Sequence, residues 1–219
     1  MNQEFPNTKF RVVVADASDA SNQQIQELVS SLSDIHLTIL INNVGGGSVC
    51  KPLEDHVPRE VDSMMNLNAR FPIQITRALL STFTKTSDPR LIMTIGSLGT
   101  SGVPYAVPYG GSKAFNMSMS ASLDVEMRTE GKNVEVIGIP VGGVTEVGHR
   151  KDAATFFTPN GRTMARAALA RVGCGRAVVI GYLGHAIQIF FLELLPRAVK
   201  ESLVVPIMKR YKEEALRNK

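Results

Sequence analysis

Short apolar runs alternate along this chain with longer segments in which apolar residues recur at helical spacing. The runs are rich in β-branched residues, and polar or glycine-containing stretches follow them. Continuous apolar runs of this length are typical of strands that are covered on both faces of a sheet. The five predicted strands are RVVVAD (11–16), LTILINN (37–43), RLIMTIGS (90–97), VEVIGIPV (134–141) and RAVVIGY (176–182).

Helices are predicted between these strands. Apolar residues from Ile25 to Leu32 recur three and four positions apart, and the segments 58–85 and 109–130 are long enough for three turns or more. Alternation of strands and helices favours an α/β fold with a parallel, doubly wound, Rossmann-like sheet. Ligands of such sheets bind outside the carboxyl ends of the strands. The polar and loop residues found at those ends are Asp16, Asn42, Asn43, Ser97 and the stretch 140–145.

Composition is consistent with one domain over residues 1–219. The chain is 44% hydrophobic and has no low-complexity run, which is enough for a single sizeable core. Cys50 and Cys174 lie far apart and have no histidine or cysteine neighbours at metal-ligand spacing. We interpret them as free thiols and predict no metal site.

The net charge of +4 lies entirely in the last residues of the chain. Residues 197–219 hold seven Lys and Arg against three Glu, and no basic stripe accompanies the rest, so nucleic-acid binding is disfavoured. This tail follows an apolar segment, so 183–219 is predicted to be an apolar helix with a basic extension. We expect contact with a membrane surface rather than a span. The alternative is a helix that covers the substrate, followed by a solvated tail.

The stretch PYGGSKAF places Tyr109 and Lys113 four residues apart within a predicted helix. Positions i and i+4 share one helix face, so the ammonium can lie beneath the phenol. A nearby cation favours the ionised phenol, which would suit proton transfer at neutral pH. A packing role for the tyrosine is the alternative.

Six motifs together resemble the short-chain dehydrogenase/reductase family, in the family's order and over nearly the whole chain. They are ADAS after the first strand, NNVG after the second, Asn68 in a helix, GS at the end of the third strand, YGGSK and PVGGVT. The segments FFTPNGRTMARAALARVG and GYLGHAIQ, with NNVG, are similar to the branch that holds 17β-hydroxysteroid dehydrogenases and very-long-chain 3-oxoacyl-CoA reductases.

The resemblance implies catalytic roles for four residues. Tyr109 would protonate a carbonyl oxygen, Lys113 would assist it and hold the nicotinamide ribose, and Ser97 would donate to the substrate oxygen. The carbonyl of Asn68 would hold a water that links the lysine to solvent. Because Pro72 lacks an amide hydrogen, the sequence predicts that this carbonyl is left free. The alternative is a plain proline kink or a helix that starts near Pro72.

The resemblance also implies a nicotinamide dinucleotide cofactor. Asp16 would accept from the adenine amino group, with Ala17 alongside it, and residues 42–45 would pass along the ribose and nicotinamide. Val144 and Thr145 would meet the carboxamide. The full set of implied cofactor residues is Asp16, Ala17, Asn42, Asn43, Val44, Gly45, Lys113, Pro140, Val144 and Thr145.

Several features depart from the family pattern. Ser97 precedes Tyr109 by twelve residues, where thirteen are usual, which raises the question of whether its hydroxyl is displaced. No glycine-rich phosphate turn precedes Asp16, so the first strand here matches the family's third, and two strands that would lie between 11–16 and 37–43 are missing. The sheet would therefore either leave a gap or pair these two segments directly.

Two readings of the whole chain follow from the resemblance. In the first, it is an oxidoreductase that reduces a lipophilic ketone, a 3-oxoacyl-CoA or a steroid-like carbonyl, with NADP(H) favoured over NAD(H). It would form homodimers through its long helices and lie on the cytosolic face of the endoplasmic reticulum membrane, or in the cytoplasm if it has no anchor. In the second, it is a truncated, inactive member or a gene-model fragment that acts at most through dimerisation.

Overall fold

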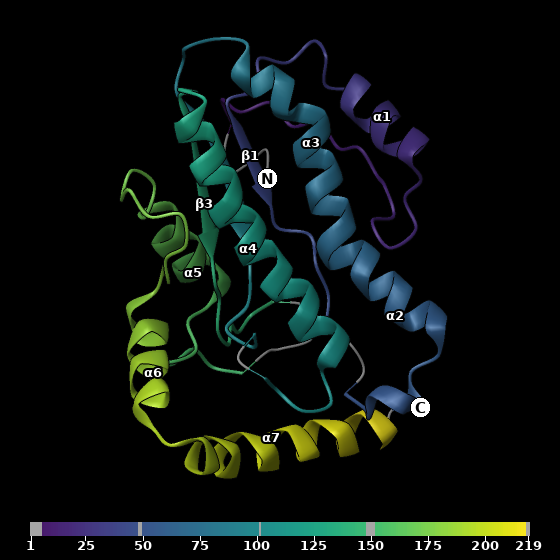
Figure 1. The fold of residues 1–219 in the computed structure, drawn as a ribbon, viewed down its shortest axis with the longest axis vertical. Coiled ribbons are helices and arrows are strands. Elements are labelled where there is room, and N and C mark those ends of the chain that lie inside the picture. The colour runs from purple at the N-terminus through teal and green to yellow at the C-terminus, as the bar shows by residue number, and fades with distance from the viewer. Residues whose placement is uncertain (1–5, 48–49, 101, 148–151, 218–219) are drawn as a thin grey trace.

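The computed structural model describes residues 6–47, 50–100, 102–147 and 152–217. Helices pack against a small sheet, and two further helices extend along one side and the lower edge of the molecule (Figure 1). The elements in chain order are α1 (Asn22–Ser30), β1 (Ile39–Asn42), η1 (Leu53–Asp55), α2 (Pro58–Met65), the π-helical turn η2 (Asn66–Arg70), α3 (Phe71–Thr84), β2 (Arg90–Ile95), α4 (Val107–Thr129), β3 (Val134–Ile139), α5 (Gly161–Leu169), α6 (Leu183–Leu194) and α7 (Arg197–Arg217).

The three strands form a parallel sheet in the order β1-β2-β3, which confirms the predicted α/β class. The register pairs Ile39 with Leu91 and Arg90 with Val134. Since all three strands run in one direction, Asn42, Ile95 and Ile139 bring their carboxyl ends to the same edge of the sheet. This edge is where the chain's candidate chemistry gathers.

Both faces of β2 and β3 are covered, as their continuous apolar runs predict, whereas Ile39 and Ile41 of the edge strand β1 are 54% and 45% exposed. On one face, Ile92 and Val136 pack with Phe83 of α3 and with residues of α1 and α4. On the other face, Met93 and Ile137 pack with residues of α5. Neighbouring strand residues point to opposite faces, so the apolar runs of β2 and β3 each supply both cores.

The predicted strand at 176–182 is reduced to a single bridge. Val178 forms a parallel bridge with Gly138, and the amide of Val179 donates to the Gly138 carbonyl at 3.0 Å. The segment therefore lies beside β3 as the expected next position in the sheet, but it does not continue as a ladder.

The prediction of a strand at 11–16 is wrong. The segment has no regular structure and does not pair with β1, so direct pairing with 37–43 does not occur. Val12 is 79% exposed and Val14 92% exposed. Apolar side chains favour a strand only where a neighbour supplies hydrogen bonds and burial, and no described strand lies beside these residues.

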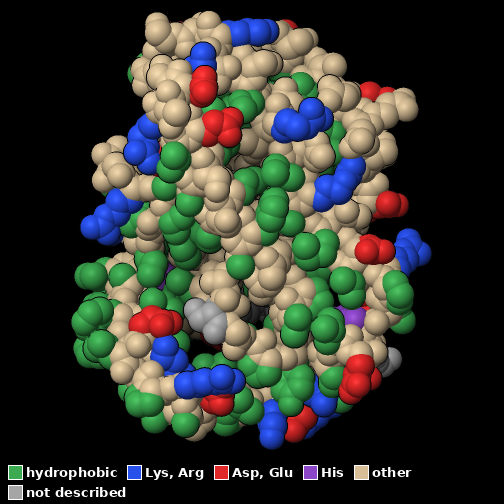
Figure 2. All heavy atoms as spheres, viewed as in Figure 1, with side chains coloured by type: hydrophobic (Ala, Val, Ile, Leu, Met, Phe, Trp, Pro, Cys, Tyr) green, Lys and Arg blue, Asp and Glu red, His purple; other side chains and the backbone are tan. Residues whose placement is uncertain are grey.

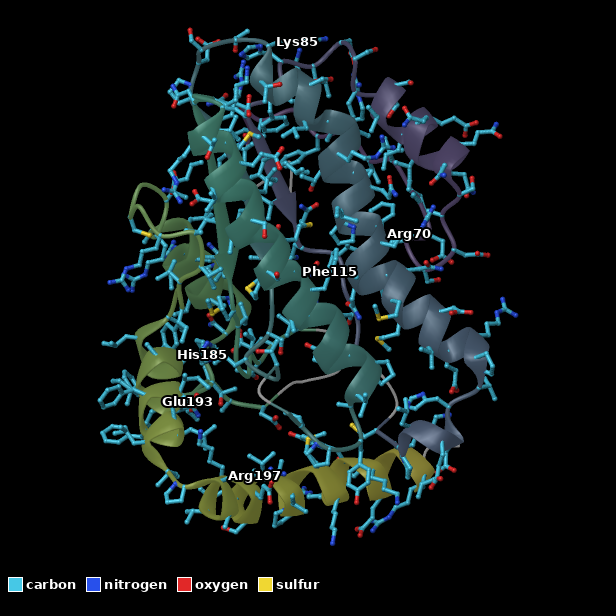
Figure 3. The ribbon with its side chains drawn as sticks, viewed as in Figure 1. Arg70, Lys85, Phe115, His185, Glu193 and Arg197 are labelled. Carbon is cyan, nitrogen blue, oxygen red and sulfur yellow. The ribbon has the colours of Figure 1, made fainter. Side chains whose placement is uncertain are left out.

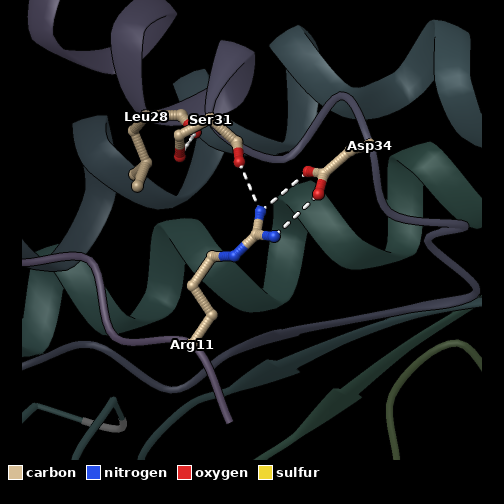
Figure 4. A network of polar contacts seen from close by, with 4 residues as sticks. All are labelled: Arg11, Leu28, Ser31 and Asp34. Carbon is tan, nitrogen blue, oxygen red and sulfur yellow. Dashed lines mark hydrogen bonds and ion pairs between the residues drawn. The ribbon is translucent and has the colours of Figure 1, made fainter. Parts of the chain in front are cut away.

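A side-chain network holds the start of this segment instead (Figure 4). The two terminal guanidinium nitrogens of Arg11 donate to the Asp34 carboxylate, Nη2 at 2.7 Å and Nη1 at 2.8 Å. Nη1 also donates to the Ser31 carbonyl at 2.8 Å. This ion pair holds the pKa of Asp34 at about 2, below its usual range. The N-terminal segment is thus attached to the end of α1 rather than to the sheet.

The predicted helix at 58–85 is observed as one helical rod with a π turn at its centre. Pro72 lies within this rod, directly after the π turn, and removes one backbone amide donor there. The predicted apolar helix and basic extension at 183–219 are observed as α6 and α7. They separate at Leu195, which is extended because Pro196 follows it. Within the described ranges, no helix is both long and apolar enough to cross a bilayer.

Candidate active site

A pocket of about 510 Å³ lies at the carboxyl-end edge of the sheet. The loops that follow β1, β2 and β3 form its walls, and the first two turns of α4 close one side. Its lining residues are Asn43, Gly45, Gly46, Gly47, Ile95, Gly96, Ser97, Leu98, Gly99, Tyr109, Lys113, Val141, Gly142 and Gly143.

Tyr109 and Lys113 both face this pocket from α4, as their spacing predicts. Pro108 lies just inside the start of the helix, where its fixed φ angle suits the first turn. Tyr109 is half-buried, and Lys113 is 6% exposed. The structure therefore brings a phenol and a sheltered ammonium to one cavity.

Lys113 is buried without an anionic partner. Among the residues that the structure describes, none accepts a hydrogen bond or forms an ion pair with its Nζ atom. Burial accordingly lowers the pKa of its ammonium. A buried cation that still faces a pocket fits a ligand that offers hydroxyl acceptors, and this is the chemistry of a sugar ring.

Ser97 lines the same pocket from the end of β2 despite its unusual spacing from Tyr109. Its Oγ accepts from the amide of Gly99 at 3.0 Å, which leaves the hydroxyl hydrogen available. A Cβ atom added to Gly99 would lie 3.3 Å from Ser97 Oγ and 3.9 Å from Tyr109 Cε1. Both side chains thus adjoin one glycine, and the shorter loop does not remove the hydroxyl from the pocket.

The prediction that the Asn68 carbonyl is free is wrong. Asn68 lies in the π turn and is fully buried, and its carbonyl accepts from Asn116 Nδ2 at 2.8 Å. Buried carbonyls need a partner, and α4 supplies this one from 48 residues away. Pro72 removes one local donor, and the fold replaces it with a side chain.

The Asn68 side chain forms two hydrogen bonds with the glycine loop that follows β1. Its Oδ1 accepts from the Gly46 amide and its Nδ2 donates to the Gly46 carbonyl, each at 3.1 Å. A Cβ atom on Gly45 would lie 2.5 Å from Lys113 Nζ and 2.8 Å from Asn68 Oδ1. Gly45 is therefore required for the close approach of the lysine to this loop.

The two asparagines at the end of β1 occupy different environments. Asn43 lines the pocket. Asn42 points into the interior, where its Nδ2 donates to Thr76 Oγ1 at 2.9 Å and lies 3.4 Å from Thr94 Oγ1. The structure thus assigns Asn42 a role in joining β1 to α3 and β2, and it does not bring this side chain to the pocket.

Asp16 lies apart from the Tyr109 pocket, in a separate hollow of about 430 Å³. Its carboxylate accepts from the amide and the hydroxyl of Ser18 at 2.9 and 2.7 Å, and these bonds lower its pKa. The neighbouring Ala17 is buried. Arg59 and Ser63 line both this hollow and a third pocket, which reaches Gly47 at the rim of the Tyr109 pocket.

The loop that follows β3 forms the remaining wall. The loop begins at Pro140 and includes two further residues that are implied to contact the cofactor. Val144 lines an apolar hollow behind the wall, and Thr145 is fully buried. The Thr145 hydroxyl donates to the Asp152 carbonyl, and its amide donates to the Pro159 carbonyl at 3.0 Å. The sequence prediction places both residues near the cofactor, whereas their side chains here face away from the Tyr109 pocket.

Two residues that support the site carry no signal in the sequence. Asn116 holds the Asn68 carbonyl, and His185 of α6 contacts the loop after β3. Local sequence patterns do not single out either residue, since both contacts span more than 40 residues.

Known proteins are similar to this chain in sequence and in fold. The short chain dehydrogenase family model matches residues 1–155. Very-long-chain 3-oxoacyl-CoA reductases from Lodderomyces elongisporus and Schizosaccharomyces pombe are 31% and 30% identical, over 85% and 90% of this chain. The chain spans 56% and 61% of the length of those two relatives. A bulky-bulky ketone specific alcohol dehydrogenase from Comamonas testosteroni has the same fold, with a TM-score of 0.70, 22% identity, and coverage of 88% of this chain and 73% of its own. The matched family model, read together with the pocket, shows that this chain belongs to the short-chain dehydrogenases.

Proposed function

We propose that this chain is the catalytic part of an NADP(H)-dependent reductase that converts a lipophilic ketone to an alcohol. The observation that carries this proposal is that Tyr109, Ser97 and a buried Lys113, which has no partner among the described residues, face one pocket. A 3-oxoacyl thioester is the substrate class that we favour, because the two most similar relatives reported above are named for that reaction. A steroid-like ketone is the other class.

The pocket's own residues suit the proton transfer of this reaction. When bound, the nicotinamide ring supplies the hydride that adds to the carbonyl carbon. Tyr109 donates its phenol proton to the carbonyl oxygen as negative charge develops there, and the Ser97 hydroxyl donates a hydrogen bond to the same oxygen. Lys113 stabilises the resulting phenolate and holds ribose hydroxyls. Asn68, held by Asn116, keeps the glycine loop against the lysine.

The proposed cofactor path runs from the Asp16 hollow to the Tyr109 pocket. Asp16 would accept from the adenine amino group at one end, and Asn43 and Gly45 would contact the ribose at the other. The three adjoining cavities between these ends support this path. Val144 would reach the carboxamide through its backbone groups, because its side chain faces the hollow behind the wall. Thr145 would support this stretch of the loop, since its amide and hydroxyl already donate to Pro159 and Asp152.

The proposed acid role is tested with Tyr109→Phe, which removes only the hydroxyl. The assay follows NADPH oxidation with 3-oxoacyl thioesters and 17-ketosteroids, using a fusion that adds the N-terminal segment of the S. pombe relative ahead of Met1. General acid catalysis contributes roughly 10² or more, so we expect at least that loss. Tyr211→Phe, on the exposed face of α7, is the matched control. Activity above about a tenth of the unsubstituted level would refute the acid role.

Residues 1–219 by themselves are predicted to bind NADPH weakly. No glycine-rich turn precedes Asp16 in this sequence, so the two central phosphates lack backbone amide donors. The loss of several charge-assisted bonds, about 1.5 to 3 kcal/mol each, weakens affinity by at least roughly 10². Calorimetry should therefore give a dissociation constant no tighter than the high-micromolar range. Low-micromolar affinity would show that another segment holds the phosphates, and a fusion with no turnover would favour the inactive-member reading.

We also propose that two copies pair through α3 and α4. A groove between these helices contains partly exposed apolar side chains, including Ile73, Leu80 and Phe115, which is labelled in Figure 3. A glutamate at position 115 would place a charge in that face, so Phe115→Glu should shift the chain from dimer to monomer in light scattering. An unchanged mass would refute this proposal.

The C-terminal helices are proposed to rest on an anionic membrane surface, such as the cytosolic face of the endoplasmic reticulum. Figure 2 shows hydrophobic side chains gathered over α6, with Lys and Arg mixed among them over α7. Phe190, Phe191 and Leu194 are each more than 60% exposed. Exposed apolar groups beside basic ones are the features that interfacial helices combine.

A further inference from the structure

The glycine pair Gly142–Gly143 is held from two directions. On the sheet side, the Leu98 amide donates to the Val141 carbonyl at 3.0 Å, which ties this wall of the pocket to the loop after β2. On the opposite side, His185 in the first turn of α6 contacts the next two residues (Figure 3). This wall is therefore held by hydrogen bonds on two sides, from the loop after β2 and from α6, which lies more than 40 residues further along the chain.

The two ring nitrogens of His185 meet backbone groups of opposite kind. Nδ1 lies 3.2 Å from the Gly142 amide nitrogen, and Nε2 lies 3.0 Å from the Gly143 carbonyl oxygen. An amide can only donate and a carbonyl can only accept, so Nδ1 must be bare and Nε2 must carry the proton. The ring is fully buried, and burial lowers the pKa of its imidazole, which keeps it in this neutral form.

The approach of the ring requires glycine at position 142. A Cβ atom there would lie 2.8 Å from His185 Cδ2 and 2.9 Å from Nε2, which is closer than real Cβ contacts allow. The Tyr182 ring packs edge-on against the imidazole, with 5.2 Å between centroids. The imidazole in turn fixes the Gly142 amide and the Gly143 carbonyl, which belong to the two peptide groups that flank the one joining these glycines.

We propose that His185 is a positioning residue for the nicotinamide end of the cofactor, acting through the wall formed by Gly142 and Gly143. This inference rests on the proposed function, because it assigns the ligand that this wall faces. Gly142 and Gly143 line the pocket together with Tyr109 and Lys113. A rotation of the two peptide groups that His185 bonds, one on each side of this glycine pair, would change the shape of the pocket at its nicotinamide end, and would leave the distant adenine hollow unchanged.

The test compares two ligands that differ only in the nicotinamide group. NADPH and 2′-phospho-ADP-ribose are titrated, to millimolar concentration, against the unsubstituted chain, His185→Phe and His185→Asn. Phenylalanine keeps a ring without either nitrogen, whereas the asparagine oxygen can replace Nδ1 as the acceptor. We expect His185→Phe to weaken NADPH binding roughly tenfold, as loss of a hydrogen bond implies, with 2′-phospho-ADP-ribose unchanged. His185→Asn should restore most of the loss.

Hydrogen exchange without ligand provides a second, independent measurement. The Gly142 amide should exchange faster in His185→Phe than in the unsubstituted chain, while amides of β2 and β3 stay protected. Unchanged exchange at Gly142, or equal weakening of both ligands, would overturn the role of His185 alone. Equal affinity of the unsubstituted chain for the two ligands would instead overturn the proposed function. The two failures are therefore distinguishable.

Discussion

The hydrogen bond between Asn116 and Asn68 allows a quantitative prediction, because the chain contains a matched exposed bond. In each case an asparagine Nδ2 donates to a backbone carbonyl at 2.8 Å: Asn116 to Asn68 in the interior, and Asn133 to Ser87 at the surface. Asn116 is 1% exposed and Asn68 is fully buried. Replacing each donor by alanine removes bonds of equal length at two sites that differ in burial, and also in that Asn116 lies within α4 while Asn133 lies in the loop before β3.

Opposing effects determine the size of the change in Asn116→Ala. An orphaned buried carbonyl costs about 1–3 kcal/mol, while alanine is better than asparagine within a helix by up to about 0.7 kcal/mol. The buried Oδ1 of Asn116 has no partner among the described residues, so its removal costs nothing further. The expected net loss of unfolding free energy is about 0.3–2.3 kcal/mol. In Asn133→Ala, water replaces the lost donor, and the change should stay within about 0.5 kcal/mol.

Urea denaturation of the two variants at neutral pH measures this difference directly. The slope of free energy against urea should be the same for both, because neither change alters the surface exposed on unfolding. If Asn116→Ala is no less stable than Asn133→Ala, the buried carbonyl has found another partner, and the Asn68 turn does not depend on α4.

Three other predictions concern the pocket and the surface. Gly45→Ala places a methyl group 2.5 Å from Lys113 Nζ and should abolish detectable NADPH binding, whereas Gly47→Ala, with open space around its Cβ, should not. The pKa of buried His185 is lowered. As the pH falls, this histidine therefore takes up a proton in the unfolded chain at a higher pH than in the folded chain. Stability should thus fall, by up to about 1.4 kcal/mol per pH unit, as pH drops below about 6.5, the usual pKa of a histidine in an unfolded chain, and His185→Phe should lack this component in thermal scans. Deletion of 197–219 should weaken sedimentation with anionic vesicles but not with neutral ones, and equal sedimentation would contradict the membrane proposal.

Local sequence patterns predict the parts of this fold that depend on local chemistry. The strands β1, β2 and β3, the helix that carries Tyr109 and the placement of Ser97 at a strand end all follow from apolar runs and motif spacing. The failure at 11–16 is physical, since the valines in this segment are as apolar as those of a true strand but have no neighbour to pair with.

The contacts that complete the site are invisible to local patterns for another reason. Asn116 and Asn68, and His185 and Gly142, meet only after helices far apart in sequence have packed. Asn42 shows the same limit in reverse, because its motif indicates a cofactor contact while tertiary packing turns its amide toward Thr76. Motifs identify which residues matter at this edge of the sheet, and packing decides which way each one points.

The π turn at Asn66–Arg70 also affects how α2 and α3 can evolve. A π turn holds one residue more than an α turn, and one residue rotates a helix by about 100°. The apolar stripes of α2 and α3 are therefore out of phase along the sequence, although the two helices form one rod. Because one π turn and one α turn each complete a single rotation, deleting one residue here would convert the turn to α and leave the apolar faces of α2 and α3 pointing in their present directions. This turn is thus the place where the rod can lose one residue without rotating α2 away from its contacts.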